Sequence, residues 1–458
     1  MRWFFHYQLS ARKTPCFSYG DIRTLAEYSQ DIAPSPNQDY FYAYGYDFDT
    51  LHNSCYNPGM KTYKYRIYPT KAQETSLEKM LEECRWLYNK ILETRKNSYE
   101  QSGILLGNYD TMTMIPDWKK ERPSLKMVHS QVLQNVNIRV DLAFKAFFRR
   151  VKAGDDPGYP RFKGYGRYDS LCYPQYGNGV RLDGSTLILS KLGSIKVKLH
   201  RELNGKPKTV CVRRAATDKW FVTISCAPDG GYLPGADSNP LPKSEKVAGV
   251  DVGLLSFATL SNGEKIANPR FFKHEQDTLA KAQRKMSKLA KGTPERRKAR
   301  KVVSRIHERI TNKRTDFAHK ESRKLVNTYG VIVFEKLAVV DMMSNHTQVF
   351  GNKLNQSIAD VAWSQLAQFT AYKAADAGRL FLQVDPRNTS KKCSRCSSLV
   401  PKDLNVRVHD CPRCGLILDR DHNAAINILA LGLQRINAGG CPGGADEVVE
   451  ALGFSRGE

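Results

Sequence analysis

The chain has 458 residues, enough for roughly two to four domains, and its 71 Lys and Arg against 46 Asp and Glu give a formal net charge of +25. This excess of positive charge indicates a polyanionic partner, with counterion release from a phosphate backbone as the driving force. Because no apolar run approaches the roughly 18 residues that would span a bilayer, and the opening residues have too short an apolar core for a signal peptide, we expect a cytoplasmic protein without a membrane partner.

Residues 1–59 differ from the rest of the chain. They carry four basic residues against six acidic ones, and their many Tyr and Phe follow neither a helical nor a strand period. At Met60 the pattern changes to MKTYKYRIYPT, whose alternation predicts a half-buried strand. We interpret Met60 as the functional start, and a genuine accessory segment is the alternative.

Two helical stretches follow this strand. Thr70 and Gln73 match the capping-box pattern, and apolar residues recur at helical spacing after them and again over residues 124–150. Such stripes are typical of a packed core rather than of a ligand site. We therefore expect a small helical domain over residues 76–154.

The next stretch, from Gly158 to Pro228, consists of short strand patterns separated by turn residues. It begins with YPRFKGYGRYDSLCYPQYGNG, in which Tyr and Phe alternate with Lys and Arg. This pattern suits stacking on nucleic acid, and strand packing is the alternative. Together with the strand at Met60, these segments predict a small barrel over 60–75 and 155–230 that the helical domain interrupts.

Residues 231–246 are rich in Pro, Gly and Ser and mark the clearest boundary in the chain. Beyond them come two strands joined by an Asn-Gly turn, a long helical stretch, a strand, a helix and another strand. This order predicts an α/β domain built on a central mixed sheet.

The long helical stretch, residues 281–324, has 17 Lys and Arg against four acidic residues. A run of charge is usually a solvated helix face, but this density indicates phosphate contact. The candidate nucleic-acid contacts are Lys285, Arg296, Arg297, Arg300 and Arg305.

Two CxxC pairs, Cys393 with Cys396 and Cys411 with Cys414, are separated by 14 residues. Four thiolates complete a tetrahedral Zn(II) site and leave no position for substrate, so we expect a structural zinc, with an iron–sulfur or redox role as the alternative. Gly415 supplies the backbone freedom that such a knuckle needs. The other cysteines are interpreted as small buried hydrophobes: Cys16, Cys55, Cys84, Cys172, Cys211, Cys226 and Cys441.

Three acidic residues stand at the ends of predicted elements of the α/β domain. Asp251 lies in VAGVDVG, Glu335 ends VIVFE, and Asp421 opens a helix in DRDHNAAINIL. Each alone is typical of a turn or cap, but three converging carboxylates can hold two Mg(II) ions for phosphodiester hydrolysis. Asp419 is interpreted as a helix N-cap, and His422 as a solvated helix histidine.

These motifs resemble those of the TnpB family, transposon-encoded RNA-guided nucleases related to type V CRISPR effectors. GVDVGL, FEKL and the tract from Cys393 through DRDHNAAINI carry the resemblance, and KYRIYPTKAQ and YPRFKG are similar to the family's amino-terminal half. The resemblance covers about residues 60–432.

The resemblance implies a multidomain α+β architecture. A β-barrel wedge domain with a helical recognition insertion would precede an RNase H-like (RuvC) α/β nuclease domain with an inserted zinc ribbon that binds target nucleic acid. The implied ranges are 60–75 and 155–230 for the wedge domain, 76–154 for the recognition domain, 247–390 and 417–435 for the nuclease domain, and 391–416 for the ribbon.

It also implies that Asp251, Glu335 and Asp421 are the catalytic acids and magnesium ligands, and that the four paired cysteines bind zinc. A guide RNA from the transposon end and target double-stranded DNA would be the partners, with base pairing reading the target beside a short adjacent motif. An RNA-guided DNA-binding repressor and a strand-transfer transposase are the alternatives. Residues 1–59 and the glycine-rich tail 436–458 lie outside the family pattern, and disorder is the interpretation of the tail.

Overall fold

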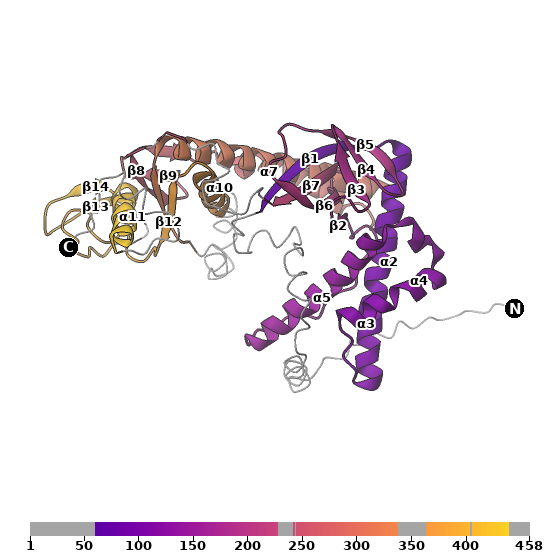
Figure 1. Ribbon diagram of the computed structural model, residues 1–458. Coiled ribbons are helices and arrows are strands. Elements are labelled where there is room, and N and C mark those ends of the chain that lie inside the picture. Colours follow the sequence, from indigo (N-terminus) through magenta and orange to yellow (C-terminus); the bar gives the residue numbers. More distant parts are fainter. Residues whose placement is uncertain (1–59, 228–240, 243, 338–362, 404, 439–458) are drawn as a thin grey trace. The chain divides into compact units, whose positions relative to one another are not determined.

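The computed structural model describes residues 60–227, 241–242, 244–337, 363–403 and 405–438 (Figure 1). The interpretations of residues 1–59, of most of the linker and of nearly all of the tail therefore lie outside the described residues. The chain divides into two compact units, Met1–Pro228 and Asp229–Glu458, which are taken one at a time below. None of the helices within the described ranges is long and apolar enough to cross a membrane.

The first unit contains a seven-stranded antiparallel sheet with the order β2-β6-β7-β1-β5-β4-β3 (Figure 1). Its strands are β1 (Lys61–Tyr68), β2 (Ser170–Tyr173), β3 (Val180–Asp183), β4 (Thr186–Leu189), β5 (Gly193–Lys198), β6 (Lys206–Arg214) and β7 (Trp220–Ala227). The predicted alternation of β1 is confirmed, because Tyr63, Tyr65 and Ile67 are buried.

Tyr176, which follows the edge strand β2, connects β6 near that edge with β3 at the other edge of the sheet. Its backbone N–H donates to the carbonyl of Lys208 in β6 at 2.7 Å. Its hydroxyl accepts a hydrogen bond from the N–H of Leu182 in β3 at 2.9 Å. The sheet is therefore nearly closed, in agreement with the expected barrel.

The helices of this unit are α2 (Lys71–Ser102), α3 (Asn108–Thr113), α4 (Ile115–Glu121), the 3₁₀ helix η2 (Pro123–Met127) and α5 (Ser130–Lys152). The capping box of α2 is confirmed: Gln73 N–H donates to Thr70 Oγ1 at 3.3 Å, and Thr70 N–H donates to Gln73 Oε1 at 3.0 Å. The second helical stretch begins as η2, and its α-helix starts only at Ser130. Helices and barrel share one hydrophobic core, to which α2 contributes Leu77 and α5 contributes Val136.

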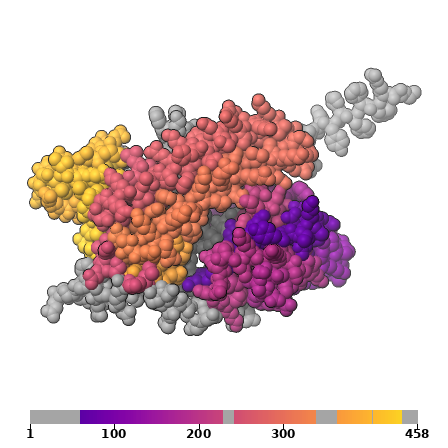
Figure 2. Space-filling model, turned by 90° about the horizontal axis from the view of Figure 1, so that it is seen from above, coloured from indigo at the N-terminus to yellow at the C-terminus, as the bar shows by residue number. Residues whose placement is uncertain are grey.

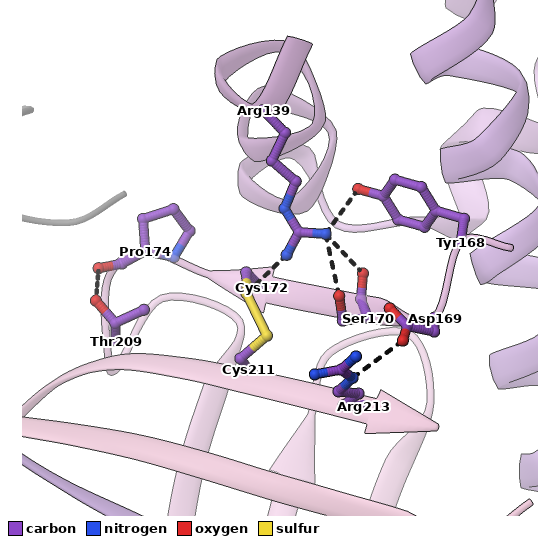
Figure 3. Close-up of a disulfide and its surroundings, with 9 residues drawn as sticks. All are labelled: Arg139, Tyr168, Asp169, Ser170, Cys172, Pro174, Thr209, Cys211 and Arg213. Atoms are coloured by element: carbon purple, nitrogen blue, oxygen red, sulfur yellow. Dashed lines mark hydrogen bonds and ion pairs between the residues drawn. A yellow bond between two sulfur atoms is a disulfide. The ribbon is translucent and has the colours of Figure 1, made fainter. Parts of the chain in front are cut away.

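The interpretation of Cys172 and Cys211 as unpaired hydrophobes is wrong. They face each other across β2 and β6, with their Cα atoms 4.1 Å apart, and form a disulfide (Figure 3). The two cysteines are 39 residues apart in the sequence. No local pattern indicates their pairing, because it depends on β2 and β6 becoming neighbours in the sheet. Arg139 of α5 donates to Cys172 Sγ at 3.0 Å and so joins the helices to this strand pair. Cys84 and Cys226 are buried as predicted, and three cysteines lie outside the described ranges: Cys16, Cys55 and Cys441.

The second unit contains the mixed sheet that the element order predicts, with the strand order β10-β9-β8-β11-β12. The strands β8, β11 and β12 are parallel, whereas β9 and β10 run antiparallel to their neighbours. The bounds are β8 (Val247–Val252), β9 (Ser256–Leu260), β10 (Lys265–Ala267), α6 (Phe271–Ser287), α7 (Pro294–Thr328), β11 (Val331–Glu335), α10 (Trp363–Asp376), β12 (Leu380–Val384), β13 (Val408–Asp410), β14 (Ile417–Asp419) and α11 (Arg420–Asn437).

Helices cover both faces of this sheet (Figure 1). Ile332 and Phe334 of β11 pack in the core with residues of α7 and α10. The alternate residues Val331 and Val333 pack with Ile428 of α11. Because both faces of β11 are buried, the strand is apolar throughout, as is typical of parallel strands.

Two glycines let α11 lie directly on the sheet. A Cβ on Gly249 of β8 would lie 2.1 Å from the carbonyl oxygen of Ala425, and a Cβ on Gly432 would lie 2.4 Å from a methyl group of Val333. Larger residues at these positions would push the helix away. This close approach sets the distance between α11 and the sheet. It thereby positions Asp421 in the first turn of the helix.

Candidate active site and metal centre

The three predicted acids lie at one end of the mixed sheet. Asp251 is in β8 and Glu335 is the last residue of β11, and these strands are parallel neighbours in which Val250 pairs with Phe334. The two acids are therefore side by side. Asp421 is the second residue of α11, which packs on β8.

The acids interact strongly with one another. Burial raises the pKa of Asp251 well above its usual value, and the charges of Glu335 and Asp421 raise it further. Burial also raises the pKa of Glu335 to about 7, although hydrogen bonds from the Val252 backbone and the Asp251 side chain oppose this change. The interaction between the Asp251 and Glu335 side chains raises the pKa of Asp251 and lowers that of Glu335. Such a crowded set of carboxyl groups favours a hard divalent cation bound through oxygen.

Asp421 lies slightly apart from this pair. Its Oδ2 is 4.0 Å from the position of a Cβ on Gly253, two residues beyond Asp251. Within the described ranges, only the four paired cysteines form a group of three or more ligand side chains gathered closely enough to hold a metal ion as they stand. The acids have the right chemistry for magnesium, but their oxygens are not gathered as tightly as the four sulfurs.

Sequence reasoning missed a cation at this site. Arg407, from the segment between the CxxC pairs, places a guanidinium nitrogen 4.0 Å from Asp421 Oδ1, and its side chain is 52% exposed. No local pattern distinguishes it from the other arginines of the chain. Its position depends on the way this segment folds back beside α11, where the backbone N–H of Arg420 donates to the Arg407 carbonyl at 2.8 Å.

The neighbours of Asp421 hold the start of α11. The prediction of Asp419 as the N-cap is confirmed, since its carboxylate accepts hydrogen bonds from the N–H groups of Asp421 and His422, and it also pairs with Lys265 at 2.8 Å. The interpretation of His422 as solvated is wrong. Its Nε2 lies 3.0 Å from the carbonyl of Ser261, to which it donates, and the ring is partly buried against the turn after β9.

Two buried asparagines attach the cysteine segment to the same helix. Asn423 donates to the carbonyl of Lys392 at 2.8 Å and accepts from the N–H of Ser394 at 3.0 Å. One turn later, Asn427 donates to the carbonyls of Thr389 and Lys392. Residues on either side of Cys393 are thus fixed to the helix that carries Asp421. The sequence indicated the helix but gave no sign of this clamp.

The four cysteines converge as predicted. The sulfurs of Cys393 and Cys414, and those of Cys396 and Cys411, are 3.6 Å apart, and all four lie within 4.8 Å of one another. Sulfurs bound tetrahedrally at about 2.3 Å from Zn(II) would be roughly 3.8 Å apart, so the donor set fits zinc. A hydrogen bond from Ser398 lowers the pKa of Cys411 to about 5, which favours the thiolate that a metal needs.

The two knuckles have the same backbone form. After each CxxC the next residue is left-handed, Gly415 with φ of 65° and Ser397 with φ of 62°. In each knuckle that residue's N–H donates to the carbonyl of the first cysteine, Cys411 or Cys393, at 2.9 Å. The predicted use of Gly415 is confirmed, and Ser397 adopts the same conformation without the freedom of glycine.

The predicted nucleic-acid contacts lie on α6 and on α7, whose surface is visible in Figure 2 as the salmon and orange atoms around residue 300. Lys285, Arg297, Arg300 and Arg305 are exposed. Arg296 is partly buried, and it donates to the carbonyls of Met286 and Leu289, so its guanidinium holds the connection between the helices.

Three family models match the chain. Their descriptions are "Helix-turn-helix domain" for residues 60–103, "Probable transposase" for residues 229–346 and "Cas12f1-like, TNB domain" for residues 363–428. In this structure the first of these ranges forms β1 and the single long helix α2.

Individual proteins are also similar. A "Putative RNA-guided DNA endonuclease" of Streptomyces pristinaespiralis is 35% identical over 381 residues, covering 81% of this chain and 89% of that one. "TnpB-like protein L79" of Acanthamoeba polyphaga mimivirus is 28% identical over 201 residues, covering 42% of this chain and 38% of the relative. Among solved structures, the mini-RNA-guided endonuclease CRISPR-Cas_phi3 aligns with a TM-score of 0.41 at 9% identity, covering 94% of this chain and 98% of that chain.

Proposed function

Because the chain belongs to the TnpB family, we propose that it is an RNA-guided DNA endonuclease associated with a transposable element. It cuts target double-stranded DNA next to a short adjacent motif, by hydrolysis of a phosphodiester bond with two metal ions. The name of the Streptomyces pristinaespiralis relative supports the guided cutting. The observation that carries the chemistry is the placement of Asp251 and Glu335 side by side at one end of the mixed sheet, with Asp421 in the first turn of the helix packed on β8.

The residues of the site fit this reaction. Asp251, Glu335 and Asp421 supply the oxygen ligands for Mg(II), which when bound would activate a water molecule and stabilise the leaving oxygen. Because burial raises the pKa of both Asp251 and Glu335, a bound cation would favour the ionised carboxylates that act as ligands. Arg407 offers a guanidinium beside Asp421 for a phosphate oxygen.

The domain assignment is part of the proposal. The mixed sheet with its helices (247–390 and 417–435) is the RNase H-like nuclease domain, and residues 391–416 are the target-binding ribbon with one structural zinc. The barrel (60–75 and 155–230) is the wedge domain, and residues 76–154 are the recognition domain. The partners are a guide RNA from the transposon end and the target DNA, with Lys285, Arg297, Arg300 and Arg305 as candidate contacts; Arg296 is a weaker candidate because its guanidinium is already bonded.

RNA dependence is the experiment that tests this function. The chain is purified from cells that carry its own locus, and the RNA bound to it is sequenced. A plasmid that matches this RNA beside a library of adjacent sequences is then added with Mg(II). We expect cutting only with the matching RNA. Strand joining without RNA would instead identify a strand-transfer transposase, and guided binding without any cutting would identify a repressor.

A further inference from the structure

Residues 159–167, YPRFKGYGR, form an aromatic and basic loop of the first unit that the proposed cutting site does not use. A buried or half-buried aromatic residue stands at each end of the loop. Tyr159 packs edge-on against Phe144 and Phe147, with ring centroids 5.5 and 5.7 Å away. Just after the loop, Tyr168 is only 6% exposed. These contacts fix the loop on the helices.

The two aromatic residues inside the loop are exposed instead. Phe162 is 54% exposed and Tyr165 is 85% exposed. A single exposed ring is ordinary, but two of them three residues apart on one fixed loop, beside cationic side chains, favour an interaction surface. Buried and exposed aromatic residues thus occur within one short segment. The type of residue alone does not explain which of them are exposed.

The backbone of the loop is clamped to α2. Lys163 N–H donates to Asn89 Oδ1 at 2.8 Å, and its carbonyl accepts from Asn89 Nδ2 at 3.0 Å and from Arg85 at 3.1 Å. The next residues form a turn in which Arg167 N–H donates to the Gly164 carbonyl at 3.1 Å, while Gly166 has φ of 71°. Phe162 and Tyr165 are therefore presented to solvent from a fixed backbone.

Phe162 also forms one wall of an open cavity of about 250 Å³, whose other walls come from a single face of α2. The lining residues are Arg85, Trp86, Asn89, Lys90, Glu93 and Phe162. The cavity thus combines aromatic rings, cations and one exposed carboxylate.

This combination fits unpaired nucleotides. Exposed aromatic faces stack on single bases, and such bases are free only where a nucleic acid is unpaired. The loop contributes Arg161, Lys163 and Arg167 and no acidic residue, which suits a phosphate backbone. The Glu93 carboxylate can accept a hydrogen bond from a ribose 2′-hydroxyl, which favours RNA over DNA.

We propose that this surface, the Phe162 platform (Phe162, Tyr165, Arg161, Lys163 and Glu93), binds unpaired nucleotides of single-stranded RNA by base stacking. The proposal rests on the proposed function in one respect, since the guide RNA would supply these nucleotides. Its geometry involves only the first unit.

The test uses the full chain, freed of bound RNA, and a short labelled oligoadenylate in a fixed salt concentration. The double variant Phe162→Ala, Tyr165→Ala is compared with Tyr109→Ala, which removes another exposed tyrosine (79%) from α3 of the same unit. We expect the double variant to bind single-stranded RNA roughly 10- to 100-fold more weakly, because two stacking contacts are lost. Tyr109→Ala should bind as the wild type does, and duplex RNA should bind all three proteins equally.

Equal binding by the double variant and Tyr109→Ala would overturn the platform. So would an equal loss for single-stranded and duplex RNA when thermal unfolding shows that the variant is folded. Glu93→Ala, which removes the acceptor for the 2′-hydroxyl, should reduce the preference for RNA over the same sequence in DNA, and a wild-type chain without that preference would contradict the RNA assignment. Because no guide or cutting is needed here, a chain that binds through Phe162 and cuts nothing would refute only the proposed function.

Discussion

The acidic pair Asp251 and Glu335 shows how far residue-scale reasoning extends. Each lies near the end of an apolar strand, and parallel neighbours bring their carboxyl ends together, so the sequence could place both at one end of a sheet. The raised pKa values of the two acids could not be foreseen, because they depend on burial and on the closeness of the two side chains once β8 lies beside β11. Arg407, His422 and the bonded state of Arg296 were missed for the same reason.

Glu335 should make the metal-free protein less stable as the pH rises. Its pKa is about 7 in the folded chain against 4.5 as the ordinary value, so between these values the folded state keeps a proton that the unfolded state has lost. Stability therefore falls as the pH rises through this window and stays low above it. Glu335→Gln removes the contribution of Glu335, and we expect it to stabilise the protein by about 3 kcal/mol at about pH 8 and by less than about 1 kcal/mol at about pH 5.

Thermal unfolding in magnesium-free buffer, without a chelator that would strip zinc, measures this difference. Glu264→Gln is the matched control, since Glu264 is an acid of the same unit that is 43% exposed and paired with Lys324. A gain for Glu335→Gln that did not depend on pH would contradict the assignment.

Arg407 should assist the cutting step. Its guanidinium lies beside Asp421 and is half exposed, so it can reach a phosphate oxygen held near the acids. We expect Arg407→Ala to lower the single-turnover rate of guided cutting roughly 10- to 100-fold, with little change in target binding. Arg413→Ala, which removes an exposed cation between the second pair of cysteines, is the control. Equal rates for the two variants would exclude this role.

At the scale of elements, local sequence patterns predicted many features of single helices, strands and turns. They predicted very few of the contacts between residues that are distant in the sequence. The capping box of α2, the alternation of β1, the N-cap of α11 and the turn after Cys414 all follow from neighbouring residues, and all are confirmed. The Cys172–Cys211 bond and the attachment of the cysteine segment to α11 connect distant residues, so no periodicity reveals them.

The two asparagines should couple the stability of α11 to that of the cysteine segment. Asn427 and Asn423 bind the backbone around Cys393, so their loss leaves buried carbonyls unpaired. We expect Asn427→Ala to destabilise the protein by about 1–3 kcal/mol and to speed the loss of zinc to a chelator, because the knuckle is less well held. Zinc content of the untreated variant should remain one ion per chain.

Zinc release, followed with a colorimetric chelator, and guided cutting are measured on the same preparations. Asn437→Ala, at the exposed end of the same helix, should behave as the wild type. If Asn427→Ala lost zinc no faster than Asn437→Ala, the clamp would not support the metal site.

At the scale of the whole molecule, composition and element order indicated the class of protein. The charge of +25 pointed to a polyanion, and the order of strands and helices predicted the mixed sheet that the second unit contains. Under the proposed function, the two sets of candidate ligands are close in sequence because the cysteine segment lies directly before α11. The thiolates would stabilise that segment, and α11 carries Asp421 to the end of the sheet.

The most direct test is guided cutting of a matching plasmid by three single variants, Asp251→Asn, Glu335→Gln and Asp421→Asn, with Asp410→Asn as an exposed acidic control. We expect each of the three variants to cut roughly a thousandfold more slowly or worse, while the target is still bound and the control cuts normally. Cutting at the wild-type rate by any one of the three would contradict this prediction.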